Sequence, residues 1–168
     1  MSLSTYALTL LLPLLASGPP VSSGAVHHVP SFKIRLVDGA TLKSSDLIGK
    51  VTVIDFWGTW CPPCIAEIPE YNSFYREYRK KGVRLYGFAV ESGTEAEVKE
   101  AVRRLKIAYP IAVPAEEEID IFGDVSVFPT TWVIDRHGNI AKEFEGVFPS
   151  KQRLLRELVD RLLKERAK

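Results

Sequence analysis

Residues 53–67 read VIDFWGTWCPPCIAE, and this stretch decides the fold that we expect for the chain. It begins with an apolar run of β-branched and aromatic residues, which is typical of a strand buried on both faces in a sheet covered by helices. The run leads into Trp60 and the pair Cys61 and Cys64, and a helical pattern begins at Pro62. We therefore predict a buried strand that is joined through a short C-x-x-C loop to a helix.

The two cysteines are the only ones in the 168 residues, and their spacing limits what they can do. A C-x-x-C pair can form one short redox disulfide or supply half of a metal site, but it cannot form a disulfide framework. A structural zinc ion requires four ligands, and the three histidines, His27, His28 and His137, are dispersed. We therefore expect redox chemistry at the pair, with no metal and no cofactor. A zinc site and an inert structural disulfide are the alternatives.

The helix that begins beside Cys61 gives this sulfur a reason to be reactive. Only a thiolate attacks a disulfide, and a helix N-terminus stabilises negative charge. Thiol pKa values in C-x-x-C motifs fall from about 8.5 to between about 3.5 and 7. The helical period directs Cys64 toward the core. We predict that Cys61 is the exposed nucleophile and that Cys64 resolves the mixed disulfide.

Cys64 needs a proton acceptor for the resolving step, and two carboxylates lie near it in the sequence. Asp55 interrupts the buried strand, where desolvation is expected to raise its pKa. Glu67 lies one helical turn after Cys64. Both are candidate catalytic residues. The alternatives are that Asp55 is a buried polar group satisfied by hydrogen bonds and that Glu67 is an ordinary exposed carboxylate.

The rest of the chain alternates strand and helix patterns. We expect strands at 83–90, 109–113, 130–134 and 140–145, and helices beginning near 62, 94 and 150. Upstream, Asp38 and Gly39 form a strong hairpin signal between two short strands. This order predicts an α/β domain with a mixed central β-sheet flanked by helices and with an added N-terminal β-hairpin.

The first 25 residues differ from the rest because they contain no charged side chain. An apolar run at 6–16 precedes small residues, which is typical of a secretory signal peptide. The run is shorter than the roughly 20 residues that span a bilayer, and a retained membrane anchor is the main alternative. We expect a signal peptide or membrane anchor at 1–25, a linker at 26–30 and one domain at 31–168, placed outside the cytoplasm.

Composition and charge exclude one class of partner. The net charge is +1, and no basic stripe is interleaved with aromatic residues, so nothing favours a nucleic-acid partner. The hydrophobic fraction of 46% and the charged fraction of 26% are ordinary for a soluble globular domain of this length. We expect a monomer.

The chain resembles thioredoxin-fold proteins at positions beyond the C-x-x-C pair. Asp55 lies six residues before Cys61, at the position of the buried aspartate of thioredoxins. The other matching positions are a helix-kinking proline, a cis-proline segment and two late glycines, at Pro69, Phe128-Pro129-Thr130, Gly138 and Gly146. The resemblance implies a thioredoxin fold over about residues 30–164. It also implies a docking groove for substrate, lined by Trp60, Phe128, Pro129 and Thr130, with a cis bond before Pro129.

Finer features resemble one branch, the TlpA/ResA-like disulfide reductases, with an N-terminal hairpin like that of the AhpC/TSA redoxins. These features are FWGTWCPPC, the Glu67-Ile68-Pro69 triplet, the preceding hairpin and the leader. Members are extracytoplasmic bacterial proteins, and many serve cytochrome c maturation. The resemblance implies that Glu67 belongs to the active site and that Glu91 matches a second acidic residue. Asp55 departs from the branch, in which another residue often occupies this position.

The branch also implies partners. It predicts a reductase whose substrate is an exported protein with a disulfide, and a membrane electron-donor thiol protein that restores the Cys61–Cys64 dithiol. One alternative is an oxidase of the same fold that donates its disulfide. Another is a non-catalytic binding domain with a structural disulfide.

Overall fold

The computed structural model describes residues 27–123 and 125–165. In chain order, the elements are β1 (Lys33–Arg35), β2 (Thr41–Lys43), the 3-10 turn η1 (Ser44–Leu47), β3 (Thr52–Trp57), α1 (Pro62–Tyr78), the 3-10 turn η2 (Arg79–Lys81), β4 (Arg84–Ala89), α2 (Glu95–Leu105), β5 (Ile111–Ala112), α3 (Glu116–Asp120), β6 (Thr130–Ile134), β7 (Ile140–Glu145) and α4 (Lys151–Lys164).

The main sheet has five strands in the order β5-β4-β3-β6-β7. The β3–β4 and β4–β5 pairs are parallel, whereas β3–β6 and β6–β7 are antiparallel, so the predicted mixed sheet is confirmed. All six residues of β3 are buried, Asp55 included, as the nearly continuous apolar run predicts for a central strand. β1 and β2 form the expected separate antiparallel hairpin, and Gly39 in its turn has φ +91°.

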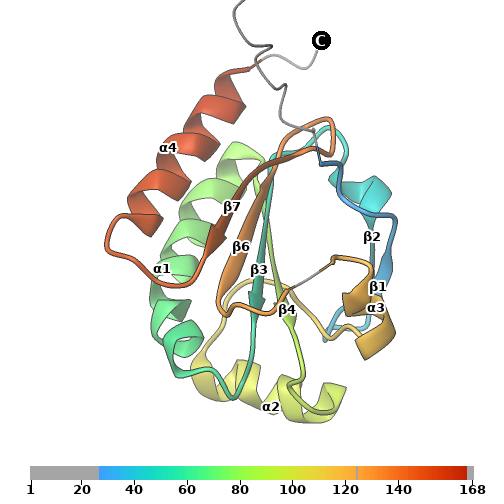
Figure 1. The fold of residues 1–168 in the computed structure, drawn as a ribbon. Coiled ribbons are helices and arrows are strands. Elements are labelled where there is room, and N and C mark those ends of the chain that lie inside the picture. The colour runs from blue at the N-terminus through green and yellow to red at the C-terminus, as the bar shows by residue number, and fades with distance from the viewer. Residues whose placement is uncertain (1–26, 124, 166–168) are drawn as a thin grey trace, which may run out of the picture.

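Two layers cover the sheet. Figure 1 shows α1 and α4 over one face, and the β1–β2 hairpin and α3 over the other. The first face buries the inward stripes of the two helices, including Ile68 and Phe74 from α1 and Leu155 and Val159 from α4. The second face buries Ile34 and Leu42 of the hairpin, together with a cluster of aromatic side chains: Phe32, Phe56, Phe88, Phe122 and Trp132. β3 lies between both cores, so its C-terminal end is held from two sides.

Most local expectations are confirmed, with small shifts. The helix expected to begin near 94 is confirmed, and Thr94 caps it through a capping box with Glu97. The strand expected at 109–113 pairs over only Ile111–Ala112. On α1, Phe74 is fully buried whereas Tyr75 is only partly buried.

The signal peptide or membrane anchor expected at 1–25 lies outside the described residues. Within 27–123 and 125–165, no helix has the length and apolar character needed to cross a membrane. Residues 27–30, expected to be linker, lie against the β6–β7 turn. The amide of Val29 donates to the carbonyl of Gly138 at 2.8 Å, and the Val29 side chain is buried.

Candidate active site

The site is built at the start of α1, where the two cysteines form a disulfide. The sulfurs of Cys61 and Cys64 are 2.06 Å apart and the Cα atoms 5.3 Å. Cys61 is the N-cap of α1, and its Sγ accepts a hydrogen bond from the backbone N–H of Cys64 at 3.3 Å. A negative charge on this sulfur after reduction would face free N–H groups and the positive end of the helix dipole.

Cys61 is not exposed, contrary to the expectation for the nucleophile. Its exposed fraction is 3%, close to the 2% of Cys64. The disulfide explains this, because it holds the Cys61 sulfur beside that of Cys64, which lies in the core cluster of α1. The two residues between the cysteines, Pro62 and Pro63, are exposed. Only reduction removes the tether between the two sulfurs.

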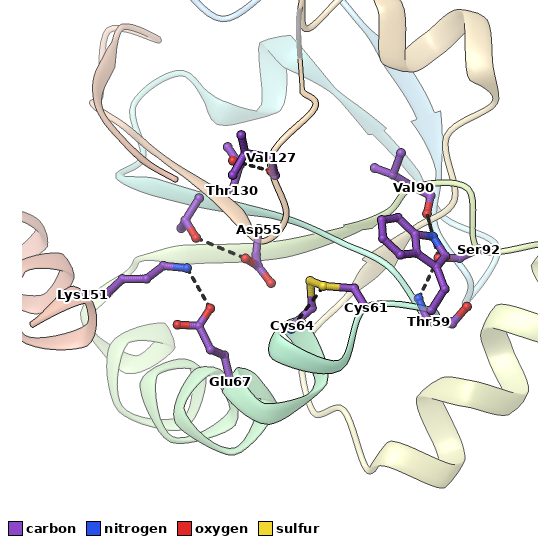
Figure 2. Close-up of a disulfide and its surroundings, with 12 residues drawn as sticks. Asp55, Thr59, Cys61, Cys64, Glu67, Val90, Ser92, Val127, Thr130 and Lys151 are labelled. Atoms are coloured by element: carbon purple, nitrogen blue, oxygen red, sulfur yellow. Dashed lines mark hydrogen bonds and ion pairs between the residues drawn. A yellow bond between two sulfur atoms is a disulfide. The ribbon is translucent and has the colours of Figure 1, made fainter. Parts of the chain in front are cut away.

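Asp55 lies on the central strand, and its carboxyl points toward the disulfide on the side of Cys64 (Figure 2). It is 2% exposed, and its Oδ1 accepts a hydrogen bond from the Thr131 hydroxyl at 3.2 Å. Burial raises the pKa of Asp55 from 3.8 to about 7, with Lys151 acting in the opposite direction and Glu67 in the same one. The expected rise is confirmed, and a carboxyl with a pKa near neutrality can both accept and release a proton at physiological pH.

Glu67 lies beside Asp55, and it is ion-paired. Its Oε2 is 2.7 Å from Nζ of Lys151, and the two side chains are 10% and 1% exposed. Figure 2 shows Lys151 reaching from α4 toward Glu67 on α1, with Asp55 near both. Glu67 is therefore not an ordinary exposed helix carboxylate.

Lys151 was not expected at the site, although two signals in the sequence indicate it. It precedes Leu155 and Leu158 by four and seven residues, so it lies on the buried stripe of α4. It is also the first residue of that helix, where the dipole disfavours a cation. A lysine on the buried stripe, at the helix N-terminus where a cation is unfavourable, predicts a buried acidic partner.

The predicted docking residues divide into two groups. Trp60 is 48% exposed and Phe128 is partly buried, and their rings meet edge to face at 5.1 Å. Both line a groove of about 910 Å³ that also contains Glu91, which has φ 46°. Pro129, preceded by a cis peptide bond as expected, and Thr130 are buried instead.

Gly58 fixes the position of Trp60, and we expect its replacement to disturb the groove. A Cβ at residue 58 would lie 2.6 Å from Cε2 and Nε1 of the Trp60 indole. The ring would have to move and lose the 3.1 Å hydrogen bond from its Nε1 to the Val90 carbonyl. Gly58→Ala should therefore lower the free energy of unfolding by about 1 kcal/mol in urea titrations. Trp60→Phe loses the hydrogen bond without the clash. If Gly58→Ala is as stable as the wild type, the crowding is relieved without cost.

No group of three or more His, Cys, Asp or Glu side chains within 27–123 and 125–165 is arranged to hold a metal ion.

Comparison with known proteins places the chain in a family. The model of the AhpC/TSA family matches residues 26–143. The chain belongs to the AhpC/TSA family. Among its relatives, the thiol-disulfide oxidoreductase ResA of Bacillus thuringiensis subsp. konkukian is 32% identical over 119 residues, which cover 71% of this chain and 68% of the relative.

Solved structures confirm the thioredoxin fold for this AhpC/TSA family member. A thiol:disulfide interchange protein of the thioredoxin family from Chlorobium tepidum TLS is 31% identical, with a TM-score of 0.71 over 82% of this chain and 97% of that one. A second protein from Chlorobium tepidum, described as DsbE, has a TM-score of 0.74 at 24% identity, over 82% and 96% of the two chains.

Proposed function

We propose that this AhpC/TSA family protein is an extracytoplasmic thiol–disulfide oxidoreductase that reduces disulfides in exported proteins through Cys61 and Cys64. One observation carries the proposal: a disulfide caps α1 beside a buried carboxyl whose pKa is raised to about 7. An inert structural disulfide gives no reason to bury an ionisable group next to it, whereas proton transfer from the Cys64 thiol needs an acceptor nearby. The names of the relatives point to the same chemistry.

The first step uses Cys61. In the reduced protein its thiolate, stabilised at the start of α1, attacks one sulfur of the substrate disulfide. The substrate S–S bond breaks, a bond forms between Cys61 and the substrate, and the first substrate thiolate leaves. The half-exposed Trp60 and the partly buried Phe128 beside the site are the side chains available to hold the substrate chain.

The second step uses Cys64. Its thiol gives a proton to a neighbouring carboxylate, and the resulting thiolate attacks Sγ of Cys61. The bond between Cys61 and the substrate breaks, the second substrate thiolate leaves, and the Cys61–Cys64 disulfide forms. Two electrons have then passed from the protein to the substrate, and the disulfide in the structure corresponds to this final state.

The proposal includes partners and location. A membrane electron-donor thiol protein would reduce the Cys61–Cys64 disulfide for the next cycle. The apolar leader supports export, with the domain either released or anchored to the membrane. The resemblance to the TlpA/ResA-like branch extends the proposal to cytochrome c maturation.

The reduction potential of the pair tests the direction. We expect a value near the −270 mV that is typical of a reducing thioredoxin-like site, measured by equilibration with glutathione or dithiothreitol. A potential near −120 mV would instead assign the protein as an oxidase. An inert structural disulfide would resist mild reductants altogether.

A trapping variant tests the order of the two sulfurs. In Cys64→Ser, Cys61 should still attack a substrate disulfide, but no second thiol can release it. We expect a stable mixed disulfide with a protein that carries a disulfide, seen as a reducible band on non-reducing gels, at near stoichiometric yield. Cys61→Ser is the matched control, and equal trapping by the two variants would contradict the assigned order.

A further inference from the structure

A charged cluster beside the disulfide contains one residue to which the steps above give no role. Lys151 is 1% exposed, and its Nζ lies 2.7 Å from Oε2 of Glu67, 84 residues away in the sequence. Burying a lysine is costly unless its charge is paired, so this contact is what keeps the ammonium in the interior. Lys151 also lies over the ring of Tyr71, at 5.9 Å from its centroid.

The cluster holds two carboxyls but only one cation. Asp55 from β3 and Glu67 from α1 share the interior with Lys151 from α4. Two buried carboxylates beside one ammonium carry a net negative charge, which a low-dielectric interior disfavours. The cluster becomes neutral when one carboxyl is protonated. The direct 2.7 Å contact makes Glu67 the partner of Lys151, which leaves Asp55 as the carboxyl that takes the proton.

We propose that Lys151 is a positioning residue that divides the roles of the two carboxyls, holding Glu67 as an ion-paired carboxylate so that Asp55 exchanges the proton with Cys64. This inference rests on the proposed thiol–disulfide chemistry of the pair and adds a specific proton acceptor to it. In the resolving step the Cys64 S–H bond breaks, the proton passes to an oxygen of Asp55, and the electron pair stays on sulfur to attack Cys61.

The other groups around Asp55 do not compete for the proton. Thr131 on β6 donates its hydroxyl to Asp55 at 3.2 Å and is 2.7 Å from the hydroxyl of Tyr71 on α1. Burial raises the pKa of Tyr71 and of Tyr109 well above the usual value, with Asp55 adding to the rise, so both remain neutral phenols. Among the described residues, the charges that act on Asp55 are those of Lys151 and Glu67.

Single replacements of the ion-paired residues should move the resolving step in opposite directions. Lys151 lowers the pKa of Asp55 and Glu67 raises it. Lys151→Met should therefore shift the pH midpoint of the resolving rate upward by about one unit, and Glu67→Gln should shift it downward by about as much. The double variant, which removes one charge of each sign, should return the midpoint to near the wild-type value. Variants that only disturb the structure would slow the resolving step without shifting its pH midpoint in opposite directions.

The measurement uses a small probe and the full chain. Reduced protein is mixed with 5,5′-dithiobis(2-nitrobenzoate), which places one thionitrobenzoate on Cys61. Release of the second thionitrobenzoate, when Cys64 attacks Cys61, is followed by stopped flow from about pH 5 to 9. If Glu67→Gln slows this release about 100-fold at every pH, Glu67 is the acceptor and the proposal is overturned. Shifts in the same direction, or none, overturn it as well.

Lys151→Arg guards against a variant that does not fold. It keeps the cation, so the pH midpoint of its resolving rate should match that of the wild type. If circular dichroism shows that Lys151→Met is unfolded, Lys151→Arg and Glu67→Gln together test the role of Lys151. The probe reacts with any accessible dithiol. An oxidising potential or a failed protein trap would therefore contradict the proposed reductase function. The shifts in pH midpoint caused by the Lys151 and Glu67 replacements test the role of Lys151 independently of that function.

Discussion

Replacing Cys61 with serine should abolish disulfide reduction, lowering the turnover of a protein disulfide by about 10³-fold or more. A serine hydroxyl is not ionised at neutral pH and cannot attack a disulfide, whereas the Cys61 sulfur already accepts the Cys64 N–H at the start of α1. The same loss should appear with a small-molecule disulfide, because the nucleophile itself is missing. The loss with the protein disulfide and the loss with the small-molecule disulfide are both measured as turnover at pH 7, with a dithiol as the electron source.

Cys64→Ser is the matched control for this experiment. It keeps the attacking sulfur, so once it has been reduced and the dithiol removed, it should complete the first step once per molecule and then stop as a mixed disulfide. The pair of variants separates attack from release. A Cys61→Ser protein that retains full turnover would show that neither the proposed nucleophile nor the proposed mechanism is right.

The buried position of Cys61 in the oxidised protein bears on this chemistry. A disulfide that is 3% and 2% exposed at its two residues is poorly placed for chance reaction with small thiols.

Much of the fold could be predicted because its signals are local. The apolar run of β3 and the Asp38-Gly39 turn each depend on residues close together in the chain. The disulfide could be predicted for the same reason, since its two cysteines are three residues apart. Pro129 required the family resemblance, because nothing in its neighbours selects a cis bond.

The electrostatics of the site depend on contacts that sequence spacing does not encode. Asp55, Glu67 and Lys151 come from β3, α1 and α4, and only the packing of both helices on the sheet brings them together. The sequence placed both carboxyls near Cys64 but could not say which one was already paired. The burial of Cys61 was missed for a related reason, since helical periodicity does not show what a disulfide does to its first residue.

Replacing Asp55 with asparagine should stabilise the folded protein above neutral pH while slowing release of substrate by Cys64. The folded protein holds the Asp55 proton up to a pKa of about 7, whereas the unfolded chain releases it near 3.8. The stability contributed by protonated Asp55 is therefore fully present below about pH 4 and is lost as the pH rises to about 7. The lost free energy is about 4 kcal/mol if the whole shift is realised.

Asparagine cannot ionise, so Asp55→Asn avoids this loss. In urea titrations of the oxidised protein it should exceed the wild type by about 2–4 kcal/mol at pH 8, and the difference should shrink to near zero by pH 4. Asp38→Asn, at an exposed turn, is the control and should change stability by less than about 0.5 kcal/mol at either pH. If Asp55 is functional, Asp55→Asn should be more stable than the wild type at pH 8 but slower in the release of substrate by Cys64, because functional groups are retained at a cost to stability. A difference that does not depend on pH would mean that Asp55 is already ionised at pH 4, and would remove it as the proton acceptor.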